Sequence, residues 1–234
     1  MINGITIEVC IENGTRIDEL AAHGPGLPPV CDRVELNDNL AAGGITAQYD
    51  TSKDVIDRCH RAGIKVMSMI RPRGGNFIYS DDEFSVMLRD VEKFGGAESD
   101  GVVFGCLDAE GAVDGKKVAA LVKAARNMTT VFHMAFDCIG AKTETPADEA
   151  RLLEARLAAI ERLAEAGVTR ILTGGALYYR AAPDAFANRE RIRTYAKAAS
   201  GRIGILPGGG ITKENYARLC AYTGLSEVHG SRLP

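Results

Sequence analysis

Residues 202–212 read RIGILPGGGIT, and this stretch holds the strand and the turn of one unit of the fold that the sequence predicts. The run Arg202–Leu206 has the short, apolar and β-branched character of a buried strand. The glycines after it permit a tight turn, and Thr212 is suited to cap the start of the amphipathic segment Thr212–Ala221. A strand, a glycine-rich turn and a helix in this order form one βα unit.

The same alternation of short apolar runs and amphipathic segments continues along the chain. The runs predicted to be strands are Ile5–Cys10, Arg33–Asn37, Ile64–Arg71, Gly101–Cys106, Thr129–His133, Thr169–Thr173, Arg202–Leu206 and Glu227–His229. The helical patterns are Thr15–Ala22, Asp50–Ala62, Ser80–Phe94, Asp114–Ala125, Thr145–Ala166, Asp184–Ala199 and Thr212–Ala221. Strands and helices in strict alternation predict an α/β fold in which a parallel sheet closes into a (β/α)₈ barrel of the triosephosphate-isomerase type.

A doubly wound open sheet is the alternative arrangement for such an alternation. No GxGxxG follows the first predicted strand and the composition does not shift along the chain, so residues 1–234 are predicted to form a single barrel domain. Only Gly230–Pro234 follow the eighth strand, which is too short for the helix that normally covers it. The last helix is therefore expected to be missing or shortened, and a partner subunit is expected to cover the apolar surface left bare.

Composition and charge exclude several classes of protein. The 234 residues are 46% hydrophobic and 25% charged, with a formal net charge of −3. Such a chain is not disordered, and it lacks the basic surplus that a nucleic-acid-binding protein requires. It has no long apolar run and no secretory signal pattern, which predicts no membrane partner and a cytoplasmic location. Six cysteines without a CxxC pair predict reduced thiols rather than a disulfide scaffold.

Polar side chains are predicted to gather at the carboxyl ends of the strands, where barrel enzymes keep their chemistry. Alternation along the strands turns Glu8 and Cys10 inward, together with Arg33, Glu35 and Asn37. Further polar residues lie at or just beyond the ends of later strands, namely Arg71, Arg73, Cys106, Asp108, His133, Asp137, Thr173, His229 and Ser231. Any one of them could belong to a structural ion pair, but so many at one mouth favour binding or catalysis.

Glycine-containing turns at the same mouth predict an anion site. The glycines at 208–210 follow the seventh strand and Gly230 follows the eighth, which are the two places where barrels commonly hold a phosphate. The alternative is that these glycines only make tight turns. The guanidinium groups of two arginines would suit a carboxylate or phosphate. The predicted substrate- or anion-binding residues are Arg71, Arg73, Thr173, Gly208, Gly209, Gly210 and Ser231.

One hypothesis is a barrel enzyme, a lyase, isomerase or hydrolase, that acts by acid–base catalysis on a small anionic, phosphorylated or sugar-like molecule. The predicted catalytic residues are Glu8, Glu35, Asp108, His133, Asp137 and His229. Glu35 is expected to be the base and one of the histidines the acid, while Asp137 orients a histidine. In a variant of this hypothesis a magnesium, manganese or zinc ion is held by Glu8, Glu35, Asp108 and His133.

Several motifs together resemble the CutC family, namely IEVC, RVEL followed by GGIT, IRPRGGNFIYSDDEF, VFGCLDAEGAVD, TVFHMAFD, RILTGG, ILPGGGI and EVH. They span nearly the whole chain, and the long arginine- and histidine-containing motifs are the specific ones. The resemblance implies a barrel of the triosephosphate-isomerase type, a cytoplasmic location and a homo-oligomer, either a dimer or a tetramer. It also implies a role in copper homeostasis with copper binding.

The resemblance links copper to cysteines at the ends of the first two strands, and Cys10 matches the first of them. Asn37 stands where the family commonly has the second, and an amide is a poor ligand for copper(I). Cys106 and Cys138 could complete a soft-metal set with Cys10, or they could be small buried hydrophobic residues. The copper hypothesis and the enzyme hypothesis both remain open at this stage.

Overall fold

The structure is a computed structural model that describes residues 4–21, 29–140, 149–177 and 184–233. Its strands are β1 (Thr6–Glu12), β2 (Arg33–Asn37), β3 (Lys65–Met69), β4 (Gly101–Phe104), β5 (Thr129–Phe132), β6 (Arg170–Thr173), β7 (Gly204–Pro207) and β8 (Glu227–Gly230). Its α-helices are α1 (Ile17–Ala21), α2 (Tyr49–Arg61), α3 (Asp81–Gly96), α4 (Gly115–Ala125), α5 (Glu149–Glu165), α6 (Arg189–Ala199) and α7 (Tyr216–Thr223). Two short 3₁₀ helices are η1 (Leu40–Ala42) and η2 (Met134–Cys138).

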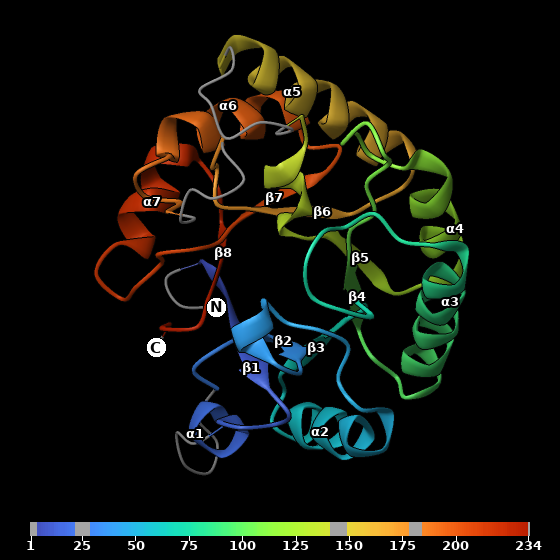
Figure 1. The fold of residues 1–234 in the computed structure, drawn as a ribbon. Coiled ribbons are helices and arrows are strands. Elements are labelled where there is room, and N and C mark those ends of the chain that lie inside the picture. Colours follow the sequence, from blue (N-terminus) through green and yellow to red (C-terminus); the bar gives the residue numbers. More distant parts are fainter. Residues whose placement is uncertain (1–3, 22–28, 141–148, 178–183, 234) are drawn as a thin grey trace.

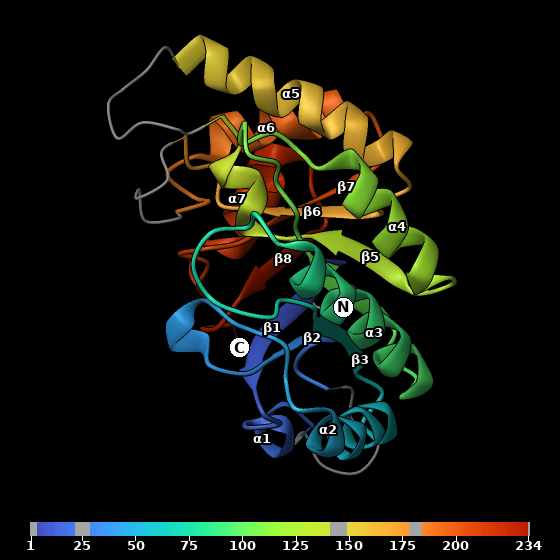
Figure 2. The same ribbon diagram turned by 45° about the vertical axis from the view of Figure 1, so that its right-hand side comes forward.

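The strands form one parallel sheet in the order β7-β6-β5-β4-β3-β2-β1-β8. An isolated bridge between Gly208 and His229 joins the two edges of this sheet, so that the barrel is nearly closed. The helices lie outside the strands in both views of the ribbon (Figures 1 and 2). The predicted (β/α)₈ barrel is confirmed. None of the described helices is long and apolar enough to cross a membrane.

Local chemistry explains where the helices begin. Ser80 and Glu83 form a reciprocal capping box, so α3 starts as predicted. The predicted start of α7 was wrong, because the Thr212 N–H donates to Asn215 Oδ1 and closes a turn before the helix. Asn215 is consequently the N-cap residue, and the helix begins one turn later than the sequence suggested. The predicted start of α5, at Thr145, lies outside the described residues.

The inside of the barrel is divided into an apolar and a polar half. The apolar half comprises Met67, Met69, Val103, Val131, Leu172 and Leu206, from strands β3 to β7. The polar half comes from β1, β2 and β8 and contains Glu8, Arg33, Glu35, Asn37 and His229, all buried. The alternate residues of β1, such as Ile7 and Val9, belong to the larger hydrophobic cluster between sheet and helices. The alternation in the sequence therefore predicted the inward residues of β1 and β2 correctly.

No helix follows β8 in the described part of the chain, as the sequence predicted. Val228 of β8 is nevertheless fully buried, and it shares a hydrophobic cluster with Ile211 and Leu233. Among the described residues, Ile78 is the single large hydrophobic side chain that is exposed. The expected bare apolar surface is thus not found in the described residues. The homo-oligomer remains a prediction, which light scattering on the purified protein would test.

Candidate functional site

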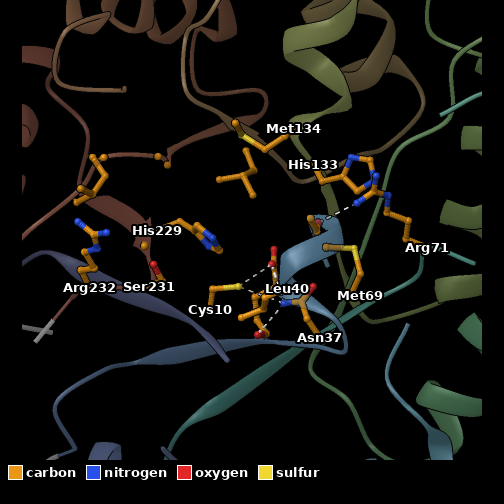
Figure 3. A pocket seen from close by; sticks show the side chains of 18 of the residues that line it. Cys10, Asn37, Leu40, Met69, Arg71, His133, Met134, His229, Ser231 and Arg232 are labelled. Carbon is orange, nitrogen blue, oxygen red and sulfur yellow. Dashed lines mark hydrogen bonds between the residues drawn. The ribbon is translucent and has the colours of Figure 1, made fainter. Parts of the chain in front are cut away.

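A pocket of about 570 Å³ opens at the carboxyl ends of the strands (Figure 3). Of the residues predicted from the sequence, it is lined by Cys10, Glu35, Arg71, His133, Gly208, Gly209, Gly210, His229 and Ser231. The other predicted residues lie outside this lining, namely Glu8, Arg73, Cys106, Asp108, Asp137, Cys138 and Thr173. The structure therefore brings together about half of the predicted set.

Three potential metal ligands lie close together in the polar half of the barrel interior. Cys10, Glu35 and His229 each offer one ligand atom, and these atoms lie within 4.8 Å of one another. Cys10 Sγ lies 3.6 Å from Glu35 Oε1, and Asn37 Nδ2 donates to both atoms, at 3.3 and 3.0 Å. The pairing of the strands causes this meeting, because β1 lies between β2 and β8 in the sheet and Cys10 is in register with Glu35.

A chain of paired charges leads from His229 through Glu8, and its members range from buried to partly exposed. His229 Nδ1 is hydrogen-bonded to Glu8 Oε1 at 2.7 Å, and Glu8 is 1% exposed. The other carboxylate oxygen of Glu8 accepts a hydrogen bond from Arg33, which also pairs with Glu227 at 2.8 Å. Arg170 closes the chain by pairing with Glu227 at 2.9 Å. Glu8 thus holds the imidazole by Nδ1, and Nε2 is the ring nitrogen that is not bonded to Glu8.

The charges of this cluster follow from burial and from its neighbours. Burial by itself would raise the pKa of Glu8, but Arg33 and His229 lower it to about 2. Burial raises the pKa of Glu35, and burial together with Glu35 raises the pKa of Cys10 to about 11. Burial opposes a charged imidazole, yet Glu35 and Glu8 raise the pKa of His229 well above its usual value. Glu8 is therefore ionised opposite a cationic His229.

His133 lies in a different environment on the opposite side of the pocket (Figure 3). Its Nδ1 accepts the N–H of Ala135 at 3.1 Å, which places the proton of the neutral ring on Nε2. Burial, assisted by the charge of Arg71, lowers the pKa of His133 to about 3. The ring packs against Phe77 with centroids 4.8 Å apart. His133 is consequently a neutral hydrogen-bond donor and a poor proton source at neutral pH.

Four pocket residues carry buried polar atoms without a hydrogen-bond partner in the described part of the structure. These atoms are Glu35 Oε2, Asn37 Oδ1, Arg71 Nε and His133 Nε2. Buried polar atoms are almost always satisfied in native proteins, because an unpaired group loses its hydration without replacement. Two acceptors and two donors without described partners thus belong to residues that line one cavity.

The two arginines that the sequence suggested as a pair are separated in space. Arg71 lines the pocket, whereas Arg73 pairs with Glu83 at 2.5 Å and lies outside it. Asp108 is used locally, since its carboxylate accepts the N–H groups of Glu110 and Ala112. Neither Arg73 nor Asp108 is therefore placed to touch a molecule in the pocket.

Asp137 has partners that differ from the expected histidine. Its two carboxylate oxygens accept hydrogen bonds from the Thr173 hydroxyl and from the Gly174 N–H. Burial raises the pKa of Asp137 to about 6 despite these donors. The expected orientation of a histidine by Asp137 is thus replaced by a contact that joins η2 to the end of β6. The fully buried Arg156 reinforces this region by donating to the Asp137 carbonyl.

Neither of the two metal sets suggested by the sequence is assembled. Cys106 and Cys138 lie outside the pocket lining, and burial raises their thiol pKa values to about 12 and about 11. The observed cluster takes Cys10 from the soft set and Glu35 from the hard set, and adds His229. Phe77, which lines the pocket, was not among the residues predicted from the sequence. Only strand pairing could have revealed the cluster, because its members come from β1, β2 and β8.

Known proteins of one family share both the sequence pattern and the barrel fold of this chain. A sequence model of the CutC family matches residues 5–233. A CutC family protein of Enterococcus faecalis is 36% identical over 226 residues, which are 97% of this chain and 98% of the relative. A CutC structure from Streptococcus agalactiae, whose name refers to copper homeostasis, has a TM-score of 0.85 at 35% identity and covers 98% of this chain and 100% of its own.

The likeness to more distant barrels concerns the fold alone. Deoxyribose phosphate aldolase from Aeropyrum pernix has a TM-score of 0.64 at 14% identity, and the match covers 96% of this chain and 85% of the aldolase. Barrels of this type host unrelated chemistries, so this match says nothing of the reaction.

Proposed function

This chain belongs to the CutC family, and from that premise we propose that it binds one metal ion between Cys10, Glu35 and His229. The observation that carries the proposal is the meeting of a thiol, a carboxylate and an imidazole within 4.8 Å. Two metal–ligand bonds of about 2.0 to 2.3 Å span at most about 4.6 Å, so small side-chain movements toward one another would let all three coordinate one ion. A cytoplasmic location, which the family resemblance implies, remains part of the prediction.

The donor set favours a borderline divalent ion over copper(I). Copper(I) is selected by thiolates and thioethers, whereas sulfur, nitrogen and oxygen donors together suit zinc(II). Cys10 is the single thiol of the described cluster, and the amide of Asn37 turns its N–H toward that sulfur. The residues therefore do not fit a two-cysteine copper(I) site. Three protein ligands beside an open pocket resemble the arrangement of zinc sites that keep one position free.

The environment of His229 supports a metal at its Nε2. Metal-bound histidines usually donate their second ring N–H to a carboxylate, which fixes the ring and increases its basicity. Glu8 occupies this place on Nδ1 at 2.7 Å. Glu8 is itself held by Arg33, so the imidazole is held in position, and a bound ion would displace the proton that the cationic ring carries on Nε2.

We expect Cys10→Ser to weaken zinc(II) binding by about 100-fold or more, because the thiolate is the strongest donor of the set. The measurement is a competition titration of reduced, tag-free protein against a chromophoric zinc chelator. Cys138→Ser is the matched control, since that half-buried thiol lies outside the pocket. We expect wild type and the control to bind one equivalent of zinc(II) with equal affinity.

Other metals distinguish this assignment from its alternatives. Equal zinc(II) affinity in wild type and Cys10→Ser would contradict the site. Magnesium or manganese binding that survives Cys10→Ser would contradict a role of the thiol and would point to Glu35 and His229 alone. Copper(I) bound in preference to zinc(II), and lost in Cys10→Ser, would instead support the copper role that the name of the Streptococcus agalactiae relative carries.

A second candidate function is catalysis on a small molecule, as a lyase, isomerase or hydrolase. The size of the pocket favours it, because about 570 Å³ is far more than a single ion needs and lies in the range of small-molecule sites. Glu35 and the Glu8–His229 pair would provide acid–base groups beside that molecule. Incorporation of deuterium from D₂O into a bound molecule, followed by NMR, would test this function.

A further inference from the structure

Arg71 is a buried cation whose charge no described acidic side chain balances. The residue is 6% exposed, and its terminal nitrogens donate to the backbone carbonyls of Gly43, Gly44 and Gly75. These carbonyls tie the loop after β2 to the loop after β3, which explains the burial of the side chain. They are neutral, however, and a buried charge without a counter-charge is costly. A bound anion would supply the missing charge.

Arg71 and His133 each have one side-chain N–H without a hydrogen-bond partner among the described residues, and both residues contact the Phe77 ring. Arg71 Nε and His133 Nε2 are buried and have no hydrogen-bond partner among the described residues. The Phe77 ring brings them together, because its centroid is 4.9 Å from Arg71 Cζ and 4.8 Å from the imidazole centroid. Figure 3 shows Arg71 and His133 adjacent at one side of the pocket, away from Ser231 and Arg232.

We propose that Arg71 and His133 bind the oxyanion of a small hydroxylated acid, a carboxylate or a phosphate monoester, in the barrel pocket. The charged guanidinium and the neutral N–H of the imidazole would each donate one hydrogen bond to this oxyanion. The inference deepens the second candidate function by naming its ligand class, and it does not depend on the metal site.

The remaining lining of the pocket agrees with this ligand. Glu35 is the single acidic side chain among the lining residues, and it lies beside His229 rather than beside Arg71. The unpartnered Glu35 Oε2 and Asn37 Oδ1 are acceptors that would receive hydroxyl groups of the same molecule. The apolar wall contributed by Met69, Met134 and Leu172 would face the carbon skeleton. The pocket therefore has a cation at one side and hydrogen-bond acceptors at the other, which suits a hydroxy acid.

Three probes that share one skeleton test the proposal. Glycerate carries a carboxylate, glycerol 3-phosphate carries a phosphate, and glycerol carries neither. We expect at least one of the two acids to bind with a Kd of about 1 mM or tighter, measured by isothermal titration calorimetry on chelator-treated full-length protein. Glycerol should bind at least about tenfold more weakly, because it lacks the group that compensates Arg71.

Variants at the two donors locate the bound acid. His133→Asn removes the Nε2 donor but keeps a side-chain acceptor near the position of Nδ1, so that the Ala135 N–H stays satisfied. We expect it to weaken binding of the acid about tenfold, and Arg71→Lys to do so to a similar extent. Arg73→Ala is the control, because this arginine pairs with Glu83 outside the pocket, and its affinity should stay within about twofold of wild type.

The outcomes separate this inference from the metal proposal. Binding of the acid that persists in Cys10→Ser, and is lost in His133→Asn with unchanged thermal stability, supports the oxyanion site whether or not zinc(II) binds. Failure of both acids to bind, equal binding of glycerol and its acids, or full affinity in His133→Asn would each overturn it. The metal proposal would still be tested separately, by the zinc(II) affinity of Cys10→Ser.

Discussion

Arg33→Met is expected to lower the free energy of unfolding by about 3 to 5 kcal/mol, as is typical when one partner of a buried ion pair is removed. The Arg33 side chain is 6% exposed and lies between Glu8 and Glu227, whose side chains are 1% and 16% exposed. Methionine fills part of the space but removes the cation between the two carboxylates, so that Glu8 keeps only His229 and Glu227 keeps only Arg170 among their described charged partners. Urea unfolding followed by circular dichroism measures the loss.

Arg170→Met provides the matched control, because Arg170 pairs with the same Glu227. Its side chain is 27% exposed, so water screens the ion pair and can hydrate the Glu227 carboxylate once the arginine is removed. We expect a loss of about 1 kcal/mol or less. Equal losses of unfolding free energy in the two variants would show that burial does not determine how much these ion pairs contribute to stability. A small loss for Arg33→Met would mean that Glu8 takes up a proton instead.

Acid is expected to destabilise the protein through His133 by about 3 kcal/mol between pH 6.5 and about pH 4. Burial and the neighbouring Arg71 lower the pKa of His133 from 6.5 to about 3 in the folded state. The unfolded chain therefore takes up a proton at this histidine below pH 6.5, while the folded chain does not. Stability from this residue is present above pH 6.5 and is lost as the pH falls.

Comparison with His133→Asn isolates this effect from the other titrating groups. Asp137 acts in the opposite direction, because burial raises its pKa from 3.8 to about 6 and the folded state takes up its proton first as the pH falls. The difference in unfolding free energy between wild type and His133→Asn removes that contribution. We expect this difference to decrease by about 3 kcal/mol from pH 6.5 to about pH 4. A constant difference would contradict a neutral, buried His133.

Much of the fold could be predicted from the sequence, because the signals for it are local. Alternation of apolar residues fixed which side chains of β1 turn inward, and Glu8 and Cys10 are found there. Capping residues such as Ser80 marked the start of a helix correctly. The start of α7 was predicted wrongly, because Thr212 and Asn215 hydrogen-bond to each other in a turn before the helix. Such a turn uses the same residue types as a helix cap, so the two cannot be told apart from composition.

The sequence also placed the candidate site at the end of the barrel where the pocket lies, but it did not determine which residues meet there. Arg71 and Arg73 are two positions apart in one motif, yet one lines the pocket and the other pairs with Glu83 at the surface. Asp137 follows His133 closely but bonds to Thr173 instead of a histidine. The backbone leaves the strand at these points, so the alternation that orders side chains within a strand no longer applies.

The sequence by itself determined that this chain is a barrel whose first two strands turn acidic, basic and thiol groups inward. Only the tertiary structure decided that Glu8 supports His229, which is 221 positions away, and that Cys10, Glu35 and His229 share one small volume. The physical reason is that periodicity acts within a single strand, whereas these contacts depend on which strands pair and in what register. Closure of the sheet brings β8 beside β1 and completes the site.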